Sequence, residues 1–153
     1  MEREMDSLKR DGEESMQNPA FVNGKKRIVL ATMDRGMEDA LKKHFTQLAC
    51  EFSCVQRSME ALSDLLDHGL DLLILDMDLY GNVSIDVLPV LRRLRPRLPV
   101  VLLSDDLTQN IRTIAAEQGV TYQTEKPHDA AALSSLVDVA ASIIAKRELL
   151  ALN

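Results

Sequence analysis

Short, continuous runs of apolar residues recur along the chain from residue 27 onward. Runs of this kind are typical of strands in a parallel sheet that helices cover on both faces. We therefore predict five strands. They lie at residues 28–31, 52–55, 72–75, 100–103 and, more weakly, 120–122.

Between these runs, apolar residues recur at intervals of three and four, which is the period of an amphipathic helix. Pro96 ends the third such pattern, and Asp129 is a candidate N-cap for the last. The alternation predicts a doubly wound α/β fold with a five-stranded parallel sheet and five helices. The helical positions are Met37, Leu41, Phe45 and Leu48; Ala61, Leu62, Leu65 and Leu66; Val87, Leu88, Leu91 and Leu94; Ile111, Ile114 and Ala115; and Leu133, Leu136, Val137, Ala140, Ile143 and Ile144.

Residues 1–26 show neither pattern. They are polar and charge-mixed, and the pairs Asn18-Pro19 and Asn23-Gly24 are turn signals. A segment of this composition cannot bury enough apolar surface to form a core of its own. We therefore predict a flexible N-terminal tail at 1–26, followed by one domain at 27–150.

Composition excludes several classes of function. A net charge of −6 argues against binding to nucleic acid or to anionic membranes, which need basic surfaces. Cys50 and Cys54 form neither a metal motif nor a disulfide framework. The start of the chain does not resemble a signal peptide and no apolar run reaches membrane-spanning length, so we expect a cytoplasmic protein. A cluster of basic residues stands at the end of the third predicted helix and is interpreted as a solvated helix end. It consists of Arg92, Arg93, Arg95 and Arg97.

Three polar residues stand at the ends of predicted strands. Asp76 closes the third strand, Ser104 closes the fourth, and Lys126 follows the fifth. Because the carboxyl ends of parallel strands meet at one edge of a sheet, these side chains should converge. A carboxylate can accept a phosphoryl group, a hydroxyl can bind its oxygens, and an ammonium can neutralise its charge. The pattern predicts a site that handles phosphoryl groups.

These residues and their surroundings resemble the receiver domain of bacterial two-component response regulators, from about residue 27 to residue 148. Residues 72–76 (LLILD) resemble the family's phosphoacceptor strand, and residues 99–104 (PVVLLS) resemble its fourth strand. Residues 119–127, which end in Lys-Pro, resemble the fifth strand with its lysine, and residues 60–62 (EAL) resemble a recurring element of the second helix. The intervals between Asp76, Ser104 and Lys126 also agree with the family.

The resemblance implies a CheY-like, flavodoxin-like fold with strand order 2-1-3-4-5. It implies that Asp76 is the phosphoacceptor and that Ser104 and Lys126 interact with the phosphate. The implied partners are a sensor histidine kinase or phosphotransfer protein and a downstream protein target. A homodimer through the fourth helix, fifth strand and fifth helix is a further expectation. The chain would then be a signalling module and not an enzyme.

The chain departs from the family where an acidic pair should hold Mg²⁺. That pair falls on Thr32 and Met33; a thioether cannot bind this hard cation, and a hydroxyl is a poor substitute. Asp34 and Asp78 are the remaining candidate metal ligands, Asp34 only if the strand end turns it inward. The sequence therefore leaves Mg²⁺ binding open.

Two further departures concern the phosphate itself. Asp105 stands where the family has a small residue, and its carboxylate would repel an incoming phosphoryl group. Gln123 stands at the position of the family's aromatic switch. These residues favour an alternative to the leading hypothesis of a phosphorylated receiver, namely a phosphate-independent pseudo-receiver that serves as a docking module.

An enzyme is the third alternative. Asp76-Met77-Asp78 after an apolar strand resembles the first motif of haloacid-dehalogenase-type phosphatases, with a nucleophile and a general acid. However, the motif's threonine is absent from residues 79–81, and no acidic metal motif follows Lys126. We therefore predict that the chain is not an enzyme.

Overall fold

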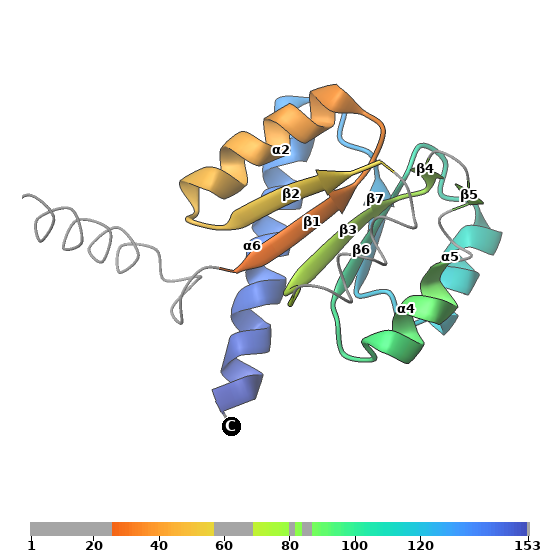
Figure 1. The fold of residues 1–153 in the computed structure, drawn as a ribbon. Coiled ribbons are helices and arrows are strands. Elements are labelled where there is room, and N and C mark those ends of the chain that lie inside the picture. The colour runs from red at the N-terminus through yellow and green to blue at the C-terminus, as the bar shows by residue number, and fades with distance from the viewer. Residues whose placement is uncertain (1–25, 57–68, 80–81, 84–86, 153) are drawn as a thin grey trace, which may run out of the picture.

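A five-stranded parallel sheet forms the centre of the molecule (Figure 1). The computed structural model describes residues 26–56, 69–79, 82–83 and 87–152. The order of the strands across the sheet is β2-β1-β3-β6-β7, which confirms the predicted order 2-1-3-4-5. The strands are β1 (Arg27–Ala31), β2 (Glu51–Val55), β3 (Leu72–Asp76), β6 (Val100–Ser104) and β7 (Tyr122–Glu125).

Four of the five predicted helices lie within the described residues. The second, predicted around residues 61–66, lies outside them, as do residues 1–25 of the predicted tail. None of the described helices is both long enough and apolar enough to cross a bilayer. The helices are α2 (Arg35–Gln47), α4 (Leu88–Leu94), α5 (Gln109–Glu117) and α6 (Ala130–Leu152).

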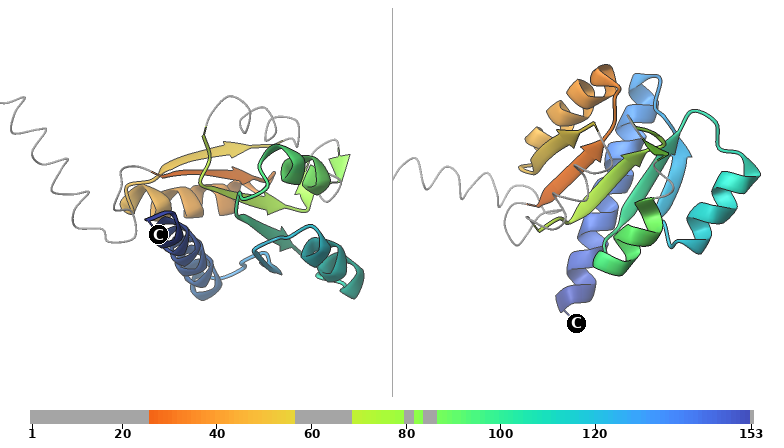
Figure 2. Two further views of the ribbon diagram at one scale, coloured as in Figure 1. Left: turned by 90° about the horizontal axis from the view of Figure 1, so that it is seen from below. Right: turned by 45° about the vertical axis from the view of Figure 1, so that its right-hand side comes forward.

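The sheet carries a hydrophobic core on each face. Helices α2 and α6 cover one face (Figure 2). On this face, Leu41 and Phe45 of α2 belong to one core cluster with Ala140 and Ile144 of α6. Helix α4 covers the other face, and Ala115 of α5 joins that second core. Every residue of β3 and β6 is buried, as expected for the continuous apolar runs of strands covered on both sides.

The fifth strand begins later than predicted, at Tyr122 and not at residue 120. Gly119 adopts a φ of 73°, a conformation that glycine takes without strain, and it ends the turn after α5. The backbone N–H of Val120 then donates to the carbonyl of Ala115 at 3.0 Å, so Val120 belongs to this turn. The strand itself is a polar edge strand (YQTE), which an apolar run could not reveal.

A short antiparallel hairpin follows β3 and was not predicted. Its strands β4 (Asp78–Leu79) and β5 (Asn82–Val83) have only two residues each. Such short strands carry no readable hydrophobic period. The hairpin places Asp78 beside the carboxyl end of β3.

The interpretation of Arg92 as part of a solvated helix end was wrong. Its guanidinium donates to the carbonyls of Gln118 (2.8 Å) and Gly119 (3.0 Å), and also to that of Leu98 (2.8 Å). Arg92 thereby satisfies carbonyls that follow α5 and carbonyls that follow α4. It ties the ends of these two helices together.

Candidate functional site

The carboxylate of Asp76 lies at the carboxyl edge of the sheet and is almost fully enclosed, with 1% of the residue exposed. Its Oδ2 accepts a hydrogen bond from the Thr32 hydroxyl at 2.7 Å. Its Oδ1 lies 2.9 Å from the Lys126 ammonium and accepts the backbone N–H of Asp78 at 3.0 Å. Both oxygens are therefore engaged, which offsets the cost of burying a charge.

The ammonium of Lys126 contacts three carboxylates that come from three different segments. Besides Asp76 of β3, it lies 3.1 Å from Asp78 of β4 and 3.5 Å from Asp105 in the loop after β6. Only 9% of the lysine side chain is exposed, whereas Asp78 and Asp105 are largely exposed. One cation thus serves three anions, and the cluster has a surplus of negative charge.

Two opposing effects set the pKa of Lys126. Burial alone would lower the pKa of the ammonium, but the hydrogen bonds to Asp76 and Asp78 and their charges raise it more. The net result is a pKa above the usual range for lysine. Lys126 is therefore a permanent cation near neutral pH.

The end of β1 holds Asp76 through Thr32, a role that sequence analysis missed. The Thr32 hydroxyl is buried, donates to Asp76, and accepts the backbone N–H of Asp34 at 3.0 Å. The sequence suggests Thr32 only as a poor metal ligand and does not predict that its hydroxyl donates a hydrogen bond to Asp76. A hydroxyl at the end of the strand next to an acid is the signal that could have found this contact.

The candidate metal ligand Asp34 has another task. Its Oδ1 accepts the backbone N–H of Met37 at 3.0 Å, and Asp34 is the N-cap of α2. An aspartate immediately before a helical pattern is a capping signal in the sequence. The other candidate, Asp78, is paired with Lys126. Among the described residues, no three His, Cys, Asp or Glu side chains are placed so that they could hold a metal ion together.

Ser104 lies on the strand next to Asp76 but contacts its own loop. Its hydroxyl donates to the carbonyl of Asp106 at 3.1 Å and accepts the Asp106 N–H at 3.2 Å. In the pairing of β3 with β6, Asp76 is level with Leu103, one residue before Ser104. The three predicted site residues therefore lie at one edge of the sheet, with Asp76 and Lys126 in contact and Ser104 turned toward Asp106.

Gln123 connects β7 to α5. Its amide nitrogen donates to the carbonyl of Arg112 at 3.3 Å, whereas its buried amide oxygen has no hydrogen-bond partner among the residues that the structure describes. The N-cap prediction for α6 is confirmed, because Asp129 Oδ1 accepts the N–H of Ala132 at 2.7 Å.

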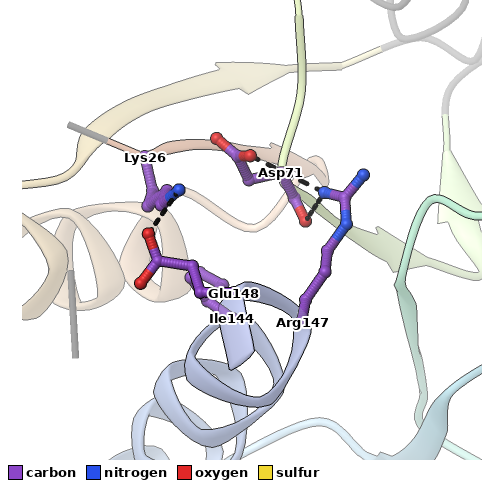
Figure 3. Close-up of a pocket in the computed structure, with 5 residues that line it drawn as sticks. All are labelled: Lys26, Asp71, Ile144, Arg147 and Glu148. Atoms are coloured by element: carbon purple, nitrogen blue, oxygen red, sulfur yellow. Dashed lines mark hydrogen bonds and ion pairs between the residues drawn. The ribbon is translucent and has the colours of Figure 1, made fainter. Parts of the chain in front are cut away.

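A second cluster of charges lies at the opposite edge of the sheet, where α6 passes the start of β1 (Figure 3). Lys26 and Glu148 form an ion pair of 2.6 Å whose side chains are only 16% and 11% exposed. Arg147 reaches the carbonyl of Asp71 at 3.1 Å and its carboxylate at 3.6 Å. Asp71 also accepts the backbone N–H of Arg27 at 2.9 Å. This cluster fixes α6 against the sheet.

Comparison with known proteins points to one family. A family model described as the response regulator receiver domain matches residues 28–138. The DNA-binding transcriptional regulator NtrC of Azospirillum brasilense is 26% identical over 111 residues, which cover 72% of this chain but only 23% of that protein.

Solved structures share the fold. A CheY-like receiver domain protein from Methanospirillum hungatei has a TM-score of 0.71 at 17% identity, covering 81% of this chain and 99% of that one. The non-phosphorylated receiver domain of HemR from Leptospira biflexa also has a TM-score of 0.71, at 22% identity and with 78% and 94% covered. The Mn²⁺-bound form of the response regulator Rcp1 has a TM-score of 0.68 at 19% identity, with 76% and 92% covered. At these identities the likeness establishes the fold alone.

Proposed function

The chain belongs to the response regulator receiver domain family, and from this premise we propose that it is a signalling module that acts by contact with another protein. We infer that this module contacts its partner without phosphorylation of Asp76. Proteins of this kind signal through the surface that they present to a partner. A chemical change at the site affects signalling only if it shifts the conformational equilibrium of that surface.

The enclosure of Asp76 is the observation that carries this proposal. To attack a phosphorus atom, one carboxylate oxygen must present a lone pair to the phosphoryl group, and each hydrogen bond that this oxygen accepts makes it a weaker nucleophile. Here Oδ2 is bound by Thr32 and Oδ1 by Lys126 and a backbone N–H. A phosphoryl group could reach Asp76 only if these partners moved, because 1% of the residue is exposed.

Phosphorylation of Asp76 by a sensor histidine kinase or phosphotransfer protein is the second candidate. The contact between Lys126 and Asp76 favours it, because the ammonium is placed to neutralise charge on a transferred phosphoryl group. Ser104, at the end of the next strand, would have to leave the Asp106 carbonyl to bind that group. In this case a phosphoryl group on Asp76 would pull the loop after β6 inward.

The surface formed by α5, β7 and α6 is the proposed contact face for a target protein or a second copy of the chain. Its strand β7 is the edge of the sheet, and Tyr122 on it is 40% exposed. Edge strands and exposed aromatic side chains are features of surfaces that pair with other proteins.

The phosphatase alternative has little support from this geometry. In that mechanism Asp78 would act as the general acid and would need to meet the leaving group of a substrate. Its Oδ2 instead contacts the Lys126 ammonium at 3.1 Å. The family assignment likewise favours signalling over catalysis.

Phosphoryl transfer can be tested directly. The chain is incubated with acetyl phosphate and Mg²⁺ and resolved on a Phos-tag gel, with Asp76→Asn as the matched variant. We expect no shifted band for either protein. A band in the wild type that Asp76→Asn abolishes would overturn phosphate independence and establish the second candidate.

A further inference from the structure

Helix α6 extends beyond the sheet that it covers. It has 23 residues, which correspond to about 34 Å, whereas a central strand of five residues spans about 17 Å. Its last turns therefore pass the amino edge of the sheet, where β1 begins (Figure 1). The sheet can cover the earlier turns of the helix but not these last ones.

Two leucines at this end of α6 are open to solvent. Leu149 is 63% exposed and Leu150 is 67% exposed, the highest values among the large hydrophobic side chains of the described residues. Neither leucine belongs to one of the two core clusters that those residues form. A single exposed apolar residue is common on a protein surface, whereas two neighbouring ones form a patch that another apolar group can cover.

The position of Lys26 indicates which segment of the chain begins beside these leucines. Its ammonium pairs with the Glu148 carboxylate at 2.6 Å, and both side chains are largely enclosed. Its carbonyl accepts the backbone N–H of Glu51 at 2.8 Å, so the backbone of Lys26 is held in place as well. Glu148 immediately precedes Leu149 in α6. The residues before Lys26 in the chain therefore start next to the exposed end of the helix.

The segment before Lys26 contains one apolar run. Ala20-Phe21-Val22 is the only run of three apolar residues within residues 1–25. Phe21 stands five positions before Lys26, and a chain of five residues spans at most about 18 Å when fully extended. The pair Asn23-Gly24 between them is a turn signal, which allows the chain to reverse toward α6. The sequence thus supplies an aromatic side chain within reach of the exposed leucines.

We propose that residues 20–22 dock on the last turns of α6 in the same molecule, with Phe21 covering Leu149 and Leu150. The contact removes apolar surface from water on both sides. The Lys26–Glu148 pair already holds one end of a short connecting segment, so the effective concentration of Phe21 at the helix is high and little further chain entropy is lost. A partner that binds the end of α6 has to displace this segment first. The inference does not depend on the proposed function.

The fluorescence of a single tryptophan in the full chain tests this contact, because the chain has no tryptophan of its own. Phe21→Trp places an indole at the proposed contact. Leu8→Trp places one earlier in residues 1–25 and is the matched control. We expect Phe21→Trp to emit at shorter wavelength than Leu8→Trp and to be quenched less by acrylamide, since its indole is shielded from water by the leucines.

Substitution of the leucines shows whether α6 provides the shielding. Leu149→Ser and Leu150→Ser, added together to Phe21→Trp, should shift the emission back to that of Leu8→Trp. Both leucines are exposed, so their loss should leave the fold intact. The matched control is the pair Val90→Ser and Leu94→Ser, which removes exposed apolar side chains of α4 and should leave the emission of Phe21→Trp unchanged.

Hydrogen exchange tests the contact of the native phenylalanine. Phe21→Ser should make exchange faster in the last turns of α6, whereas Leu8→Ser should leave it unchanged. Unchanged exchange in Phe21→Ser would contradict the proposal.

Three fluorescence results would also overturn the proposal. Equal emission from Phe21→Trp and Leu8→Trp would show that residues 20–22 are not docked. A shift that persists after loss of Leu149 and Leu150 would place the contact elsewhere. A shift that grows with protein concentration would assign the end of α6 to a second copy of the chain.

Discussion

The two edges of the sheet both carry ion pairs that are at least partly buried, but their charges are balanced differently. At the amino edge, Lys26 and Arg147 face Glu148 and Asp71, one cation for each acid. At the carboxyl edge, the single ammonium of Lys126 faces three acids, and the His128 imidazole lies 3.9 Å from one of them, Asp105. Balanced pairs are sufficient to fix a helix in place, whereas surplus charge around a buried carboxylate is a cost to the fold. The imbalance of charge, more than the presence of ion pairs, distinguishes the carboxyl edge.

Removal of the ammonium at the carboxyl edge should have the largest effect. Lys126→Met leaves the buried Asp76 carboxylate without its counter-ion, and breaking such a pair costs about 3–5 kcal/mol. We expect urea denaturation to show a loss of free energy of unfolding in this range. The matched control is Lys146→Met on α6, whose lysine is exposed and whose loss should cost less than about 0.5 kcal/mol. Equal effects of the two substitutions would contradict the comparison.

Thr32→Val should have the next largest effect. Valine has almost the same shape but cannot donate to Asp76, and a hydrogen bond to a charged group contributes about 1.5–3 kcal/mol. We expect a loss of about 2 kcal/mol on urea denaturation, whereas Thr32→Ser, which keeps the hydroxyl, should lose clearly less. A Thr32→Val variant as stable as the wild type would show that this hydrogen bond does not hold Asp76.

Lys26→Met at the balanced edge should have a smaller and more local effect. The pair with Glu148 is partly open to solvent, so its loss should cost about 1 kcal/mol. Hydrogen exchange should become faster in the last turns of α6 and stay unchanged around Asp76. Faster exchange at the carboxyl edge as well would mean that the two edges are coupled and cannot be compared as separate regions.

A pH dependence at the balanced edge should have the smallest effect near neutral pH, because it develops only in alkaline solution. Burial, followed by the charge of Asp71, raises the pKa of the Cys50 thiol from 9.0 to about 12. The unfolded chain therefore loses this proton at lower pH than the folded chain, and stability is lost as pH rises from 9 toward 12. We expect the free energy of unfolding to fall less steeply over this interval in Cys50→Ala than in the wild type. If the free energy of unfolding had the same slope against pH in both proteins, Cys50 would not contribute to this pH dependence.

The sequence predicted those parts of the fold that depend on burial. Central strands such as β3 and β6 are covered on both faces, so their apolar runs are continuous and their position is readable. Strand β7 lies at the edge of the sheet and is polar, and for this reason its start was placed two residues too early. The β4–β5 hairpin is fixed by local pairing, which leaves no pattern in two-residue strands.

The site was predictable in its location and not in its contacts. Asp76, Ser104 and Lys126 were placed at one edge because each follows a strand of the same parallel sheet. Which polar groups then bind one another depends on side-chain directions, which the sequence does not carry. Thus Thr32 turned out to hold Asp76, Asp34 to cap α2, and Ser104 to bind its own loop.

The guanidinium of Arg92 has a mechanical consequence for α5. The Arg92 guanidinium donates hydrogen bonds to the carbonyls of Gln118 and Gly119. These bonds attach the carboxyl-terminal end of α5 to α4. The opposite end begins after Thr108, close in the chain to Asp105 at the site. A shift of the loop after β6 would then move the amino-terminal end of α5 more than its carboxyl-terminal end, which Arg92 holds in place.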